Sequence, residues 1–527
     1  MARKPQSRTR KTGRRPTARP AAGRMRAPKS GVIVRMYRLG HGDCFLLAFR
    51  GARAKPVYVL IDCGFKPGSN GPDYQLGTIE QVVDDIKAAT GRRLDLVIVT
   101  HEHEDHVNGF WKPDMPYFAD FEIGAAWFAW TENPEDPLAN ELRRRHGDQL
   151  LGVVAARNRL AAAGADAAAA RVDGLLAFEL GVEPAQFLAE ATARKKDPRA
   201  SVNQQGMKLI KDKAGSRNTR YIIPHQEIMR IPGVDDVRVF ALGPPHRADL
   251  LADTDPQGAE SFAGNGAGAR VSFLAAATAS DARGAQQIRP FAERFSRPIG
   301  EAFDDPEHGA FLSARYGVAA DAAQVDLGAE SASNAAWRRI DHDWLHSAEA
   351  LALGINRGIN NTSLVLAFEL PESNKVLLFV GDAQRGNWRS WTEGGWQDGE
   401  KTITVRDLMS RTVLYKVGHH GSHGATLLGT EQDDDPNLSW MGHGKYGGEF
   451  VAMITAVSKW AQSIPKPPWI HPLPSIKAAL IKKCGGRVFQ TDTAELAAPQ
   501  APDAGWDDFI QRTRISDLYF EYEVHDR

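Results

Sequence analysis

The sequence has few cysteines, no long apolar stretch and no net charge. Three cysteines in 527 residues, Cys44, Cys63 and Cys484, exclude a disulfide framework and favour a reducing compartment. No run approaches the roughly 20 apolar residues that a membrane-spanning helix requires. The basic N-terminus also lacks the apolar segment of a secretory signal. We therefore expect a cytoplasmic protein that does not contact a membrane.

The formal net charge of zero hides an uneven distribution. Residues 1–30 contain 11 Lys and Arg and no acid, which leaves 54 basic and 65 acidic residues, a net charge of −11, in 31–527. Because residues 1–30 have no hydrophobic period and cannot bury a core, we expect them to form a disordered basic tail. The tail could attract nucleic acid, or it could be a solubilising segment with weak nonspecific affinity.

Hydrophobic patterning predicts alternating strands and helices in residues 31–527, which indicates an α/β fold. Residues 137–200 have a helical pattern, and 253–335 predict broken helices or loops. We expect a long, mainly helical insertion at roughly 131–350, either a separate subdomain or, as we favour, an elaboration of one domain. Strands are predicted at 32–37, 44–49, 57–61, 94–99, 219–242, 363–369, 375–380, 412–417, 486–490 and 518–524, and helices at 78–89, with Thr78 as N-cap, and 474–483.

A dense group of metal-ligand residues directly follows the buried strand at 94–99. His101, His103, Asp105 and His106 fall within six residues. Alternation along an extended chain points the first three to one side, and a turn after Asp105 can bring His106 round. Imidazole and carboxylate together suit Zn²⁺, and also Mn²⁺ or Fe²⁺. The end of a buried strand is the usual location of an α/β active site.

Two more strands end in the same kind of residue. Asp382 follows the strand at 375–380, and His419 and His420 follow the strand at 412–417. Asp382 could bridge two metal ions, and one histidine of the pair could complete the second site; the sequence does not say which. Two metals about 3.5–4 Å apart can hold a hydroxide nucleophile and clamp the oxygens of a displacement.

These pieces, in this order, resemble the metallo-β-lactamase superfamily. Residues 101–106 match its His-x-His-x-Asp-His motif, and Asp62 in Asp62-Cys63-Gly64 matches an early turn whose aspartate orients the metal loop without ligating. The chain is most similar to the metallo-β-lactamase domain of ComEC-type DNA-uptake proteins and to its free-standing relatives. That similarity covers about 31–130 and 355–425, through residues 40–44, 360–366, 380–382 and 416–422.

The resemblance implies an αββα sandwich and two metal ions, Zn²⁺ or Mn²⁺. Many members of the superfamily carry a further histidine ligand where this chain, like ComEC-type domains, has Asn360-Asn361-Thr362-Ser363. Asn361 could therefore be an oxygen ligand or a substrate donor, or could form a turn. His41 and Asp43 would lie near the mouth of the site, where a turn-forming role is at least as plausible.

Three functions remain open. A metal-bound hydroxide could hydrolyse phosphodiesters of DNA or RNA, with Asp105 orienting it and Ser422 or His423 stabilising the developing charge. The same group could attack a small ester, lactone, amide or phosphoester. The fold could instead serve as a non-catalytic metal-binding module. The sequence does not indicate the oligomeric state.

Overall fold

The computed structural model describes residues 23–112, 115–162, 202–257, 260–261, 304–316, 358–464, 469–496, 498–500 and 502–527, together with residue 301 and parts of 166–173. Within these residues the chain is an α/β protein with two large sheets. The predicted tail is only partly described. Residues 1–22 lie outside the described residues, but Met25 is buried and its backbone N–H donates to the carbonyl of Ala89. The packed chain therefore begins before the expected residue 31.

Each large sheet joins an antiparallel half to a parallel half. The parallel neighbours are β3-β5-β7-β8 in the first sheet and β12-β15-β16-β17 in the second. The first sheet has the order β18 (Thr513–Ile515), β19 (Tyr519–Val524), β1 (Val32–Tyr37), β2 (Cys44–Arg50), β3 (Pro56–Cys63), β5 (Leu96–Val99), β7 (Ala126–Ala129) and β8 (Thr219–Ile222). The second has the order β17 (Val488–Gln490), β16 (Val451–Ile454), β15 (Thr412–Lys416), β12 (Val376–Phe379), β11 (Val365–Glu369), β10 (Val234–Gly243) and β9 (Met229–Ile231).

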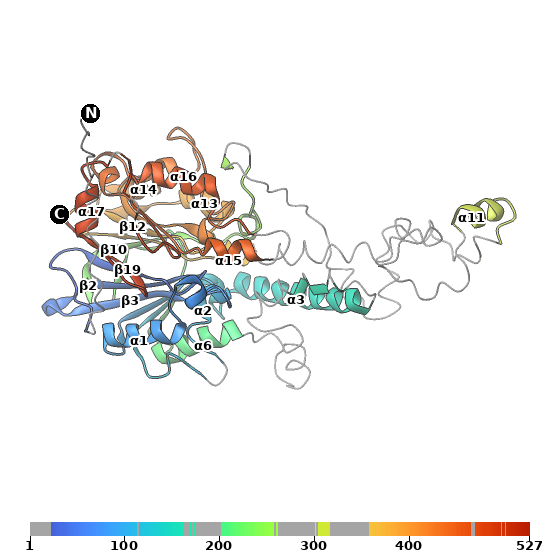
Figure 1. The fold of residues 1–527 in the computed structure, drawn as a ribbon, viewed down its shortest axis with the longest axis horizontal. Coiled ribbons are helices and arrows are strands. Elements are labelled where there is room, and N and C mark those ends of the chain that lie inside the picture. The colour runs from blue at the N-terminus through green and yellow to red at the C-terminus, as the bar shows by residue number, and fades with distance from the viewer. Residues whose placement is uncertain are drawn as a thin grey trace, which may run out of the picture.

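The two sheets pack face to face over one apolar core. Alternate residues of β2 show why both of its faces are buried: Phe45, Leu47 and Phe49 enter the core between the sheets, while Leu46 and Ala48 point to the outer face. Helices cover both outer faces, with α1 (Ile79–Thr90), α2 (Glu104–Val107) and α6 (Val202–Ala214) on one side (Figure 1). On the other side lie α13 (Arg385–Ser390), α14 (Val405–Ser410) and α16 (Pro474–Lys483). The result is four layers.

Most expected elements are present with shifted ends. The helix expected at 78–89 is α1, and Thr78 caps it by accepting from the backbone N–H of Gln81. The helix expected at 474–483 is α16. The strand expected at 94–99 is wrong as one piece, because Asp95 separates β4 (Arg93–Leu94) from β5 and turns its carboxylate back to the Tyr58 backbone N–H. The smaller pairings join β4 to β6 (Glu122–Ile123), and β13 (Trp396–Asp398) to β14 (Lys401–Ile403).

The expected insertion at 131–350 is not one continuous addition in its described part. It begins with the helix α3 (Pro137–Ala162), which runs away from the sheets (Figure 1). After α6, however, β8 extends the first sheet, and β9 and β10 form an edge of the second. The short helices α7 (Ala248–Leu251) and α11 (Gly309–Tyr316) follow. Residues 174–201, 262–300 and 317–357 lie outside the described residues.

The remaining helices are α15 (Ser458–Ser463) and α17 (Trp506–Gln511). Cys44, Cys63 and Cys484 are free thiols, and all three are buried. No helix among the described residues is both long enough and apolar enough to cross a bilayer.

Candidate metal centre

The site lies where parallel strands from both sheets end. Asp62 closes β3 in a left-handed conformation, with φ of 54°. Its carboxylate accepts from the backbone N–H of Thr100 at 2.8 Å and from the Thr100 hydroxyl at 2.6 Å. The second oxygen also lies 2.8 Å from Nδ1 of His106. Asp62 therefore fixes the end of β5 and the orientation of one imidazole, so that Nε2 of His106 points away from it.

The loop after β5 needs a glycine beneath it. His103 is the N-cap of α2, and Asp105 and His106 occupy its single turn. A Cβ placed on Gly64 would lie 2.4 Å from both the Asp105 carbonyl carbon and the His106 nitrogen. No side chain fits in that space, so Gly64 allows the ligand loop to rest directly on the end of β3.

Four side chains converge from three strand ends. The ligand atoms of Asp105, His106, Asp382 and His420 all lie within 4.8 Å of one another, and all four residues are buried. Nε2 of His106 is 3.2 Å from Oδ2 of Asp382. Nε2 of His420 is 2.8 Å from Oδ2 of Asp105 and 3.5 Å from Oδ2 of Asp382.

This set fits a divalent cation. Two of its atoms, Nε2 of His106 and Oδ2 of Asp382, are buried and make no hydrogen bond among the described residues, so their close contacts are the ionic ones within this group. Buried polar atoms without a partner are costly unless something else binds them. Two imidazoles and two carboxylates are the donors that Zn²⁺ and Mn²⁺ accept. The group could therefore hold a metal ion, which both atoms would contact in place of each other.

His101 and His103 lie beside this group rather than in it. Nε2 of His101 is 3.1 Å from Nδ1 of His103, and the His101 ring centroid is 4.1 Å from that of His106. Nδ1 of His101 faces the hydroxyls of Thr100 and Ser363. A second group that could hold an ion combines His106 with Asp43 and Asp62. Of the residues expected to bind metal, Asp105, His106, Asp382 and His420 form one compact set that could hold an ion, and the imidazoles of His101 and His103 flank it.

Two buried lysines neutralise the carboxylates, and sequence reasoning assigned no role to either. Lys416 contacts Asp43, lies 3.3 Å from Oδ1 of Asp382, and donates to the Gly381 carbonyl at 2.7 Å. Lys66 lies 2.9 Å from Oδ1 of Asp105. The position of Lys416 near the end of the apolar strand expected at 412–417 was a signal that it is buried. A fully buried lysine needs an acidic partner, so an acidic residue could have been expected beside it.

The charges shift the ionisation of the ligands in opposite directions. Burial opposes a charged His106, but Asp382, Asp43 and Asp62 outweigh it and raise the pKa of His106 well above its usual value. Burial also opposes ionised Asp105 and Asp382. Even so, Lys66 and His420 hold the pKa of Asp105 well below normal, and His106, His420 and Lys416 do the same for Asp382. Without a metal ion, these contacts favour ionised Asp105 and Asp382 and a protonated His106.

The structure distinguishes the two neighbouring histidines. Nδ1 of His420 is 3.0 Å from the Thr455 carbonyl oxygen, which leaves Nε2 facing the acids. His419 contributes its backbone N–H to Oδ1 of Asp382, while its ring points elsewhere. Its Nε2 is 3.2 Å from Nδ2 of Asn360, and its Nδ1 is 2.6 Å from the Ser422 hydroxyl. The ring of His419 is therefore not one of the converging groups, and His420 is.

Asn361 is not a ligand or a substrate donor. Its amide nitrogen donates to the carbonyls of Leu250, Leu251 and Asp253 at 2.9–3.1 Å. Its amide oxygen accepts from the backbone N–H groups of Gln384 and Asn387. Both ends of the side chain are thus used to tie α7 to the start of α13. Of the roles expected for Asn361, the structural one, in which the asparagine forms a turn, agrees best with these hydrogen bonds.

Asp43 is more deeply buried than its expected position near the mouth of the site would require. It is buried, contacts Lys416, and accepts from the Thr455 hydroxyl at 2.6 Å. Its neighbour His41 accepts the backbone N–H of Val457 at Nδ1, so Nε2 carries the proton of the neutral ring. That nitrogen lies 3.1 Å from Nδ1 of His471. Burial first, and then the neighbouring histidines, lower the pKa of both His41 and His471 well below normal.

His423 directly follows Ser422 in the chain and is half-buried.

The sequence matches no family model, and no curated protein is similar to it.

Proposed function

We propose that this chain is a metal-dependent hydrolase of the metallo-β-lactamase fold that cleaves phosphodiester bonds of DNA or RNA. The observation that carries the proposal is the convergence of Asp105, His106, Asp382 and His420 from three separate strand ends into one buried group. The four layers, with the ligands at the ends of parallel strands, support the αββα sandwich that the sequence motifs imply.

The protein groups around the ion would hold it and orient the substrate. A bound Zn²⁺ or Mn²⁺ would supply a Lewis acid and activate water at neutral pH. Asp62 orients His106, Lys66 orients Asp105, and Lys416 holds Asp382. Each of these partners restricts its ligand to one direction, which is the usual way in which a ligand geometry is maintained.

In this proposal Ser422 would donate a hydrogen bond to a phosphoryl oxygen. Burial lowers the pKa of His419 to about 3, so its ring is neutral. Nε2 of that ring lies 3.2 Å from Nδ2 of Asn360, and Nδ1 lies 2.6 Å from the Ser422 hydroxyl and 3.5 Å from Nε2 of Gln384. In the tautomer with the proton on Nδ1, the Ser422 hydroxyl accepts from this ring, and its own proton would be available for an acceptor outside the protein. Such a donor stabilises charge that develops during attack on phosphorus.

A nucleic-acid substrate is supported by two features of the sequence. The motifs at 360–366 and 416–422 resemble those of ComEC-type domains, and residues 1–30 carry 11 basic side chains that would attract a polyanion in a salt-dependent way. The same metal group could also act on a small ester, so the preference for a phosphodiester rests on these two sequence features.

The test is cleavage of single-stranded DNA and RNA with added Mn²⁺ or Zn²⁺, beside bis-nitrophenyl phosphate and a nitrophenyl ester. We expect cleavage by the wild type and its loss in Asp382→Asn and His103→Ala, with Asp433→Asn, an exposed acid, as control. Cleavage of the ester alone would transfer the assignment to small esters. Equal cleavage of nucleic acid by Asp382→Asn would remove the proposal.

A further inference from the structure

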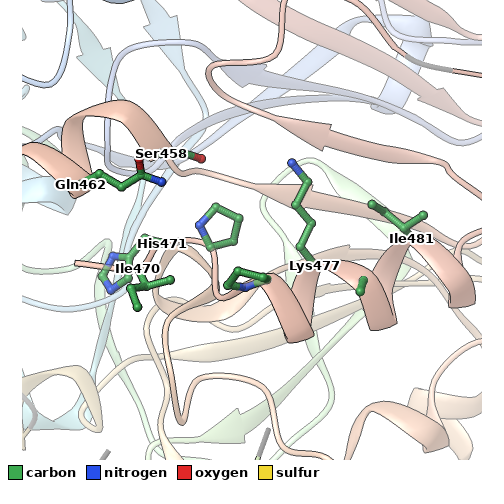
Figure 2. A pocket seen from close by; sticks show the side chains of 9 residues that line it. Ser458, Gln462, Ile470, His471, Lys477 and Ile481 are labelled. Carbon is green, nitrogen blue, oxygen red and sulfur yellow. The ribbon is translucent and has the colours of Figure 1, made fainter. Parts of the chain in front are cut away.

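A cavity of about 340 Å³ lies between α15 and α16 (Figure 2). Ser458 and Gln462 line it from α15, and Lys477 and Ile481 line it from α16. The segment before α16 completes the wall. The remaining lining residues are Ile470, His471, Pro472, Pro474 and Ala478. A volume near the lower end of the range for ligand sites suits a unit about as large as one nucleotide.

His471 connects this cavity to the metal ligands. Its ring stacks on that of His41, with centroids 5.2 Å apart, and the His41 ring lies 4.4 Å from the ring of His420. Because Nε2 of His41 donates to Nδ1 of His471, the second nitrogen of His471 carries a proton. That nitrogen has no acceptor among the described residues. The wall nearest the metal centre therefore presents an N–H donor.

The charge of the lining is positive. Lys477 is the sole ionic side chain among the nine lining residues, and none of the nine is acidic. Lys477 forms no ion pair within the described part of the chain, and its side chain extends from α16 along the cavity (Figure 2). A lysine without an acidic partner, in a cavity that an imidazole also lines, is complementary to a phosphate.

The apolar part of the lining is exposed to solvent. Ile470 is 54% exposed and Ile481 is 42% exposed, and both border this one cavity. Exposed apolar side chains that gather around a hollow mark a surface that a ligand covers. The flat face of a nucleobase could cover these aliphatic side chains, while the amide of Gln462 and the hydroxyl of Ser458 offer hydrogen bonds to its edge.

We propose that this cavity binds one nucleotide of a single-stranded nucleic acid, next to the phosphate that lies at the metal centre. The base would cover Ile470 and Ile481, and Lys477 and His471 would contact the adjacent phosphate. The role in substrate binding rests on the proposed phosphodiesterase function, but the affinity for a nucleotide chain does not require cleavage.

The test is binding of fluorescein-labelled pentathymidylate to the full chain in EDTA, followed by fluorescence anisotropy. Lys477→Glu should weaken binding roughly ten-fold, the effect of losing one charged hydrogen bond to phosphate. Ile481→Asn should also weaken it. Lys482→Glu is the matched control, because Lys482 is exposed on the same helix, does not line the cavity and gives the same charge change.

The outcomes separate this inference from the proposed function. Equal weakening by Lys477→Glu and Lys482→Glu would mean general electrostatic attraction and would overturn the inference, as would no binding by the wild type. Binding that depends on Lys477, without cleavage once Mn²⁺ is added, would support the nucleotide site and remove the phosphodiesterase proposal. Cleavage with an unchanged KM in Lys477→Glu would retain the phosphodiesterase and remove the nucleotide site.

Discussion

Replacing Lys416 with methionine should strongly destabilise the metal-free protein. The Lys416 ammonium is buried among Asp43, Asp382 and the Gly381 carbonyl. Asp43 and Asp382 raise the pKa of Lys416 despite its burial, so the side chain is charged in the folded state. Methionine has a similar length but leaves the two buried carboxylates without this cation.

The expected loss follows from the burial of the pair. Breaking a buried ion pair by removing one partner costs about 3–5 kcal/mol. Taking roughly 2 °C per kcal/mol for a large domain, Tm should fall by about 6–10 °C in EDTA. Saturating Mn²⁺ should reduce this difference, because a divalent cation beside Asp382 would supply positive charge in place of the ammonium.

The assay is thermal unfolding by circular dichroism, with and without metal. Lys482→Met is the control, since its side chain is exposed, and its Tm should match that of the wild type. If Lys416→Met unfolds at the wild-type temperature in EDTA, the two carboxylates do not depend on this lysine. The argument for a charge-balanced cluster would then be wrong.

Three further predictions concern the same site and its support. Since the raised pKa of His106 keeps it protonated without metal, an ion must displace that proton, and affinity in metal titrations should fall about ten-fold per pH unit below that pKa. Gly64→Ala should weaken metal binding at least about ten-fold, because its Cβ would displace Asp105 and His106, whereas Gly448→Ala, with open space around it, should not; equal affinities would contradict this. Asn361→Leu should lower the free energy of unfolding in urea by about 3 kcal/mol, because five backbone groups lose a partner; an unchanged urea midpoint would refute that role.

Local pattern was enough for the framework of the site. The helical spacing of apolar residues in 78–89 and the capping residue Thr78 predicted α1, and the apolar run before His101 predicted a buried strand. Because parallel strands align their carboxyl ends, the polar residues after β12 and β15, neighbours in one sheet, could be expected to meet. The resemblance to the metallo-β-lactamase superfamily added the residues after β5, which lies in the other sheet. Asp105, His106, Asp382 and His420 do meet.

The details that sequence did not predict depend on contacts between distant segments. His419 and His420 are adjacent and both have left-handed backbones, with φ of 41° and 56°, so the fold rather than the residue type decides which ring enters the group. Asn361 could be assigned only once residues 250–253 were seen against it. Lys66 became recognisable through its contact with Asp105, 39 positions away.

The most direct measurement is anomalous X-ray scattering from crystals of the protein grown with Mn²⁺ or Zn²⁺. We predict a strong anomalous peak within coordinating reach of Asp105, His106, Asp382 and His420, and its loss in Asp382→Asn. An anomalous peak only at another place, or no peak at these four side chains with either metal, would contradict the assignment of this group as a metal centre.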